Sequence, residues 1–264
     1  MIFDSNENFY ISESYRQDIL FWLNGGTSGT RVAGNGKKSN KDYYKNSFVI
    51  EFYYIKMNNV TLSVFFSAVG GLENGSNQFY NPYDMALDPV SGILYITDNS
   101  NHRIMSYAKG ANSGTLVFGG MGPGMNNTQL NGPLGIYFDS FLNSLIIANV
   151  FAHNIIRYSL GTSGWTLRAG NINGSAGSTS TSLSSPNDII LDPMGNMYVA
   201  DTGNRRIQFF YRDQWNGITI AGIAGVVGVN ANTLNTPRSV ALDGQLNLYV
   251  ADDKNHCIQK FLRY

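Results

Sequence analysis

The stretch from Pro186 to Ile207 decides the fold. It reads Pro186-Asn187-Asp188-Ile189-Ile190-Leu191-Asp192, then Met197-Tyr198-Val199-Ala200-Asp201, then Asn204-Arg205-Arg206-Ile207. Short runs of β-branched and aromatic residues, bounded by Gly, Pro, Asn and Asp, are typical of strands joined by tight turns. The stretch therefore predicts three short antiparallel strands.

The same order of residues returns at a fixed interval. Three further copies occupy Asn81–Ile104, Pro133–Ile155 and Pro237–Ile258, with their prolines about 51 to 53 residues apart. A fifth copy, Met1–Ile19, begins inside its first strand. A fourth apolar run that closes on glycine ends the units, at Thr30–Gly34, Leu116–Gly120, Thr166–Gly170 and Ile218–Gly222. Four-stranded units at such a period are typical of a β-propeller.

One segment breaks the repeat. Residues 37–71 keep only two apolar runs, Phe48–Met57 and Val60–Val69, around an Asn58-Asn59 turn, which predicts a hairpin. We therefore predict an all-β, six-bladed-like propeller as a single domain over residues 1–264, with five recognisable repeats, one degenerate repeat and a ring that need not close. The units are about 1–36, 37–71, 72–120, 121–170, 171–222 and 223–264. The late start and early end lead us to expect a fragment or an incomplete gene model.

Composition excludes several classes of protein. The 18 Lys and Arg balance the 18 Asp and Glu, and 14% of residues are charged, which argues against a strongly basic nucleic-acid binder. A single cysteine, Cys257, excludes an internal disulfide and a cysteine-based zinc site. No apolar run is long enough to span a membrane. Asp4 and Glu7 interrupt the place of a signal peptide, and both an extracellular and a cytoplasmic location stay open.

The end of the second strand and the start of the third carry a family resemblance. Asp201–Ile207 and Asp98–Ile104 resemble the NHL repeat, Asp252–Ile258 does so with Cys257 where Arg is usual, and Asn149–Ile155 is a looser match. The resemblance covers Met1–Gly36 and Gln78–Tyr264. It implies a propeller, typically of six blades. The functions it implies are protein or RNA binding, ubiquitin-ligase substrate recognition, extracellular sensing and, in one branch, a zinc-dependent lyase activity on peptidyl-hydroxyglycine.

Residues that recur in every unit are predicted to be structural. The three histidines, His102, His153 and His256, share one repeat position, so they point in different directions around the ring and cannot converge on one metal. Carboxylates at strand ends are expected to accept N–H groups of the following turns. These structural repeat positions are Asp88, Asp98, Asp192, Asp201, Asp243 and Asp252. A calcium site of the kind found in six-bladed lactonases remains a lesser alternative.

Positions that differ between units are the candidates for binding. They follow the proline at the start of each first strand, where the strands ring the channel opening, and variation on a fixed scaffold is where specificity usually lies. The candidate binding residues are Tyr83, Asp84, Asn187, Asp188, Arg238 and Ser239.

These observations favour a non-enzymatic scaffold that binds a protein or peptide partner through the channel mouth. We expect a monomer with no catalytic residue, metal or cofactor, and no nucleic-acid partner. Two alternatives stay open. One is a substrate- or RNA-recognition module of a ubiquitin-ligase-type protein, and the other is a metal-dependent enzyme like the lyases or lactonases.

Overall fold

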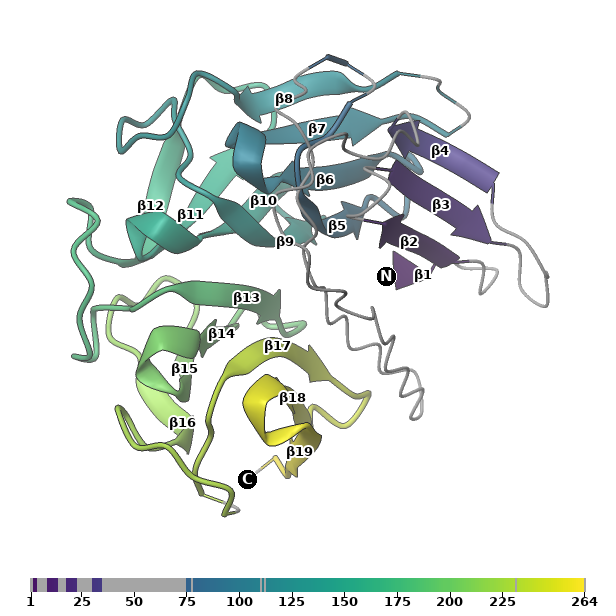
Figure 1. Cartoon of the computed structure of the whole chain (residues 1–264). Coiled ribbons are helices and arrows are strands. Elements are labelled where there is room, and N and C mark those ends of the chain that lie inside the picture. The colour runs from purple at the N-terminus through teal and green to yellow at the C-terminus, as the bar shows by residue number, and fades with distance from the viewer. Residues whose placement is uncertain are drawn as a thin grey trace, which may run out of the picture.

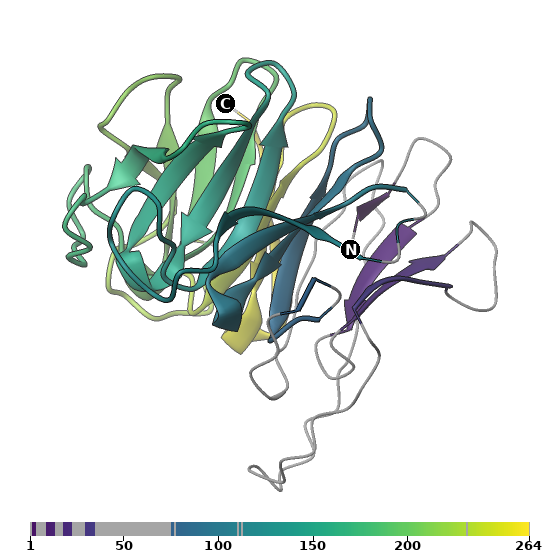
Figure 2. The ribbon, with the colours of Figure 1, turned by 90° about the horizontal axis from the view of Figure 1, so that it is seen from above.

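The chain folds into antiparallel sheets arranged side by side around a common axis (Figure 1). The computed structural model describes residues 75–263 apart from 77, 110, 112 and 231, together with the backbone of four strands within residues 2–34. Figure 2 shows the sheets from above, as a row of twisted sheets packed against one another. Only strands and four short 3-10 turns occur in the described residues. The prediction of an all-β propeller is therefore confirmed.

Each sheet is one blade, and its strands follow one another from the inside outward. The first blade is β1 (Ile2–Phe3), β2 (Phe9–Glu13), β3 (Asp18–Trp22) and β4 (Thr30–Gly34). The second is β5 (Pro82–Leu87), β6 (Leu94–Asp98), β7 (Arg103–Tyr107) and β8 (Thr115–Gly119). The third is β9 (Pro133–Asp139), β10 (Ser144–Asn149), β11 (Asn154–Ser159) and β12 (Trp165–Gly170). The fourth is β13 (Pro186–Leu191), β14 (Met197–Asp201), β15 (Arg206–Phe210) and β16 (Ile218–Gly222). The fifth is β17 (Pro237–Leu242), β18 (Leu248–Asp252) and β19 (Cys257–Phe261).

The number of blades differs from the prediction of six. The described residues form four blades of four strands and a fifth sheet of three strands. Strands β1 and β2 lie against β5, so the first and second blades are direct neighbours. The degenerate unit and hairpin predicted at 37–71 fall outside the described residues.

The start of each inner strand is irregular, and this irregularity positions the site. The pairing of β13 with β14 shifts register between Pro186 and Asp188, and the pairing of β17 with β18 shifts between Pro237 and Ser239. Proline cannot donate a ladder hydrogen bond, so the strand bulges there. A bulge re-aims the side chains that follow it, which here are Asp188 and Ser239.

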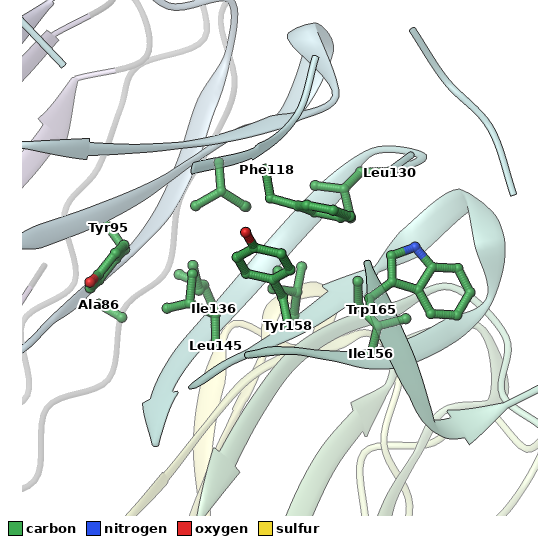
Figure 3. Packing of buried hydrophobic residues seen from close by; sticks show 11 residues of the cluster. Ala86, Tyr95, Phe118, Leu130, Ile136, Leu145, Ile156, Tyr158 and Trp165 are labelled. Atoms are coloured by element: carbon green, nitrogen blue, oxygen red, sulfur yellow. The ribbon is translucent and has the colours of Figure 1, made fainter. Parts of the chain in front are cut away.

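The hydrophobic core lies in the seams between blades, because the neighbouring blades cover both faces of the inner strands. All six positions of β10 are buried. In the seam between the second and third blades, the Phe118 and Tyr158 rings stack with centroids 4.4 Å apart (Figure 3). The Trp165 Nε1–H donates to the Gln129 carbonyl at 2.9 Å. Packing between blades therefore fixes where the inner-strand ends lie.

Candidate functional site

Carboxylates that end the first strands close the turns that follow them. Asp192 Oδ1 accepts the N–H groups of Met194 and Asn196, both at 2.9 Å. Asp243 Oδ1 accepts those of Gln245 and Asn247 at 3.0 and 2.8 Å. Asp88 and Asp139 make the same kind of contact. Each of these side chains is therefore committed to its own turn.

Carboxylates that end the second strands do not cap the following turn, which corrects the sequence-based expectation. Asp201 Oδ1 accepts the N–H of Ser184 at 2.7 Å, and Asp98 Oδ1 accepts that of Tyr80 at 2.7 Å. Both donors lie in the loop that precedes the blade. The physical reason is the register, because Asp201 stands opposite Pro186 at the start of β13.

An arginine completes this buried group. Asp201 Oδ2 accepts from Arg206 Nε at 2.8 Å, and their side chains are 0% and 4% exposed. The rest of the Arg206 guanidinium donates to three loop carbonyls, those of Ser178, Thr179 and Ser182, at 2.9 to 3.0 Å. Burial raises the pKa of Asp201, and hydrogen bonds from Ser184, Asn204 and Arg206 oppose this rise. The most repeated residues thus serve the scaffold.

In the fifth blade a different side chain pairs with the buried carboxylate. Cys257, where Arg is usual, is exposed. Gln259 Nε2 instead donates to Asp252 Oδ2 at 3.2 Å and to the Thr233 carbonyl at 3.2 Å. Asp252 is fully buried, as are Asp98 and Asp201.

Two of the histidines connect neighbouring blades. His102 Nδ1 accepts the N–H of Gly132 at 3.0 Å, and His153 Nδ1 accepts that of Ser185 at 2.9 Å. In the described residues no three His, Cys, Asp or Glu side chains gather closely enough to hold a metal ion.

Most of the predicted binding residues come together at the inner-strand ends. Asp188 Oδ2 accepts the Ser239 hydroxyl at 2.7 Å and the Val240 N–H at 3.0 Å, both from the fifth blade. Asp84 Oδ2 accepts the Ile136 N–H of the third blade at 3.0 Å. Each carboxylate therefore reaches from its own inner strand to the next, near the starts of these strands.

The charged groups near the starts of the inner strands influence one another. Burial and the charge of Asp84 together raise the pKa of Asp188 to about 7, and hydrogen bonds from Ser239, Val240 and Ile189 oppose this rise. Burial also raises the pKa of Asp84 and of Tyr83, while Arg238 acts in the opposite direction on the Tyr83 phenol. Arg238 Nε donates to Asp253 Oδ2 at 2.8 Å. We call Tyr83, Asp84, Asp188 and Arg238 the mouth cluster.

The two other predicted residues are less accessible. Asn187 and Ser239 are buried, whereas all four members of the mouth cluster are half-buried. Ser239 acts by holding Asp188. The mouth cluster is therefore the more accessible part of the predicted site.

Two residues of the site escape sequence reasoning. Gly135, the third-blade equivalent of Asp84 and Asp188, has no room for a side chain, because a Cβ would lie 2.7 Å from Asp188 Cα. Asp253 binds Arg238. It directly follows the repeat residue Asp252, and the equivalent positions of the other units hold the uncharged residues Asn99, Val150 and Thr202. Comparing the units could have found Asp253.

Comparison with known proteins agrees with this architecture. The sequence pattern of the NHL repeat matches residues 234–261, which span β17 to β19. The chain is an NHL-repeat β-propeller. No curated protein matches its sequence.

Solved structures resemble this NHL-repeat propeller in fold. A structural genomics protein of unknown function from Bacteroides thetaiotaomicron VPI-5482 matches 97% of the chain with TM-score 0.60 at 15% identity. The nidogen/laminin complex matches 99% with TM-score 0.62 at 16% identity. Virginiamycin B lyase from Staphylococcus aureus matches all of the chain with TM-score 0.54 at 14% identity.

The lengths of these proteins differ. The NHL-repeat propeller spans 66% of the Bacteroides chain, 78% of the chain in the nidogen/laminin complex and 65% of the lyase. Such low identities show the fold alone. Within the described part of the chain, no helix is long and apolar enough to cross a membrane.

Proposed function

We propose that this NHL-repeat propeller is a non-enzymatic scaffold that binds a protein or peptide partner at its channel mouth. The observation that carries the proposal is the mouth cluster. Its residues occupy repeat positions that differ between units, and they lie together. The recurrent residues Asp98, Asp201 and Arg206 are instead fully engaged in holding loops.

The charges of the cluster favour a cationic group on the partner. Asp84 and Asp188 lie close enough for the charge of one to raise the pKa of the other. Arg238 is already paired with Asp253. A lysine or arginine side chain of the partner would relieve the repulsion between the two carboxylates, because an opposite charge nearby favours their ionised forms.

The other two functions have less support. A likeness to virginiamycin B lyase at 14% identity carries no catalytic residue to this chain. The balanced charge of the chain does not favour a module that recognises RNA. Neither alternative explains why Tyr83 and Arg238, from the second and fifth blades, meet at one opening.

The complete architecture is part of the proposal. We propose one propeller over residues 1–264, with the units at about 1–36, 37–71, 72–120, 121–170, 171–222 and 223–264 in a six-bladed-like ring.

Peptide selection tests the proposed site. Peptides selected from a random phage-displayed library on the wild-type protein are expected to be enriched in Lys or Arg. Asp84→Asn and Asp188→Asn should each weaken their binding about tenfold, as expected for charged contacts in a half-buried site. Asp88→Asn removes a carboxylate at the far end of β5, which contacts its own turn, and serves as the matched control. Unchanged binding in both mouth variants would exclude this site.

A further inference from the structure

A second cluster of charged residues lies at the seam between the third and fourth blades, away from the channel mouth. Arg157 of β11 and Arg168 of β12 meet Arg212 and Asp213, which follow β15. Asp139, at the end of β9, lies beside Arg157 with 3.5 Å between Nη2 and Oδ2. We call these five residues, together with Phe141, the arginine seam.

The register places Arg157 in this seam. Arg157 stands opposite Ile146, and Ile146 stands opposite Tyr137, so the three side chains form one row across β9, β10 and β11. Ile146 lies in one buried cluster with Met197 and Phe210 of the fourth blade. Arg157 continues this row outward, toward the turn that carries Asp213.

The scaffold does not require an arginine there. The equivalent positions of the other described units with side chains hold Ser106, Phe209 and Lys260. A residue type that changes between units, at a position that the fold tolerates, is a candidate for function rather than for packing.

Positive charge is in excess in the arginine seam. Three guanidinium groups face two carboxylates, so one positive charge has no counterpart in the cluster. Asp213 pairs with two of the arginines. Its Oδ1 lies 3.0 Å from Arg168 Nη1, and its Oδ2 lies 3.7 Å from Arg212 Nε. Burial lowers the pKa of Arg157, and the charges of Arg168 and Arg212 lower it further.

One donor in the seam is unsatisfied. Arg157 Nε is buried and has no hydrogen-bond partner. A buried donor without a partner costs free energy, and such a group in a native structure needs an explanation. A guanidinium pairs best with a carboxylate through two parallel N–H groups, whereas Asp139 lies 3.5 Å from Arg157 Nη2 and leaves Nε without a partner.

The rim of the seam is apolar and accessible. Phe141 is 78% exposed, and Arg212 covers its ring with the guanidinium carbon 5.1 Å from the ring centroid. Met194, in the adjacent β13–β14 turn, is 63% exposed. Arginine next to accessible apolar side chains is a common composition of protein-binding surfaces.

We propose that the arginine seam is a second docking site, which binds an acidic segment of a protein partner. A carboxylate of that segment pairs with the uncompensated guanidinium charge, and a neighbouring apolar side chain rests on Phe141 and Met194. The single excess charge fits a carboxylate better than a polyanion. This site is independent of the proposed mouth.

Fluorescence anisotropy tests this docking site. The probe is a labelled peptide, Glu-Glu-Leu-Glu-Glu, compared with Gln-Gln-Leu-Gln-Gln. We expect saturable binding of the acidic peptide only, weakened by Arg168→Gln or Arg212→Gln by about threefold or more. Asp213→Asn removes the internal competitor and should tighten binding by about two- to fivefold, the range for exposed ion pairs.

The control uses the chain's own repeat. Lys260 is the fifth-blade equivalent of Arg157. Its Nζ lies 3.7 Å from Asp243 Oδ2 and over the Tyr249 ring. Lys260→Gln lowers the charge of the protein equally but should leave binding unchanged. The proposal is overturned if Asp213→Asn and Arg212→Gln have no effect, or if Lys260→Gln weakens binding as much. It is also overturned if a labelled oligouridine binds more tightly than the peptide and loses binding in the same arginine variants.

Discussion

Replacing Arg206 with cysteine should destabilise the fourth blade severely. Cysteine is the residue found at the equivalent position of the fifth blade, Cys257. It removes four hydrogen bonds, one to Asp201 Oδ2 and three to loop carbonyls. Ser178 and Thr179 are exposed, so their carbonyls can turn to water. The main cost is therefore the carboxylate of Asp201, which stays fully buried without its cation.

The expected loss is about 4 kcal/mol in the free energy of unfolding, since removing one partner of a buried ion pair costs about 3–5 kcal/mol. Urea denaturation followed by tryptophan fluorescence measures it. The loss should be smaller at pH 5 than at pH 8. Burial raises the pKa of Asp201, and a carboxyl with a raised pKa stabilises the folded state at low pH and loses this contribution as pH rises.

Two further variants sharpen the test. The double variant Arg206→Cys with Asp201→Asn should be more stable than Arg206→Cys alone, because it leaves no buried charge. Cys257→Ser, at the exposed equivalent site, should change stability by less than about 0.5 kcal/mol. A loss below about 1 kcal/mol in Arg206→Cys, or a double variant that is less stable still, would refute the reasoning.

Three other predictions concern the mouth and the seams. Gly135→Ala should cost about 1–3 kcal/mol, because its Cβ would lie 2.7 Å from Asp188 Cα, whereas Gly244→Ala, with no atom within 4 Å, should be neutral; thermal denaturation compares the two. His102 accepts an N–H through Nδ1 and burial lowers its pKa, so its contribution to stability should be lost as pH falls below about 6.5; urea titrations of His102→Gln at pH 7.5 and 5.5 should show a smaller pH effect than the wild type. Binding of a cationic peptide should strengthen as pH rises through about 7, where Asp188 ionises, by at most about tenfold per pH unit; calorimetry of Asp188→Asn should show no such dependence.

Much of the fold follows from the sequence because the repeat samples each constraint several times. The prolines that start β5, β9, β13 and β17 and the glycines that end β12 and β16 occur where the pattern puts them, and β8 ends at Gly119, one residue before the predicted glycine. The backbone N–H groups that bind Asp98 and Asp201 could not be predicted from the repeat. Their donors lie 17 or 18 residues earlier, and only the register of the folded hairpin brings them together.

The site shows the same limit. Comparison between units identifies Tyr83, Asp188 and Arg238 as variable, but not that residues of the second and fourth blades meet. That meeting depends on Gly135 leaving space in the blade between them. The arginine seam is less visible still, because Arg157, Arg168 and Arg212 come from three strands or turns with no shared motif.

Several side-chain-to-backbone hydrogen bonds between described blades run in one direction along the chain. His102 reaches Gly132, His153 reaches Ser185, Asp84 reaches Ile136 and Asp188 reaches Val240. The second, third and fourth blades thus each carry a side chain that binds the backbone of the next blade, and backbone is the same whichever unit follows. Gene duplication or deletion of one whole unit would leave every such junction intact. The number of blades can therefore change in evolution while the loops at the rim diversify independently.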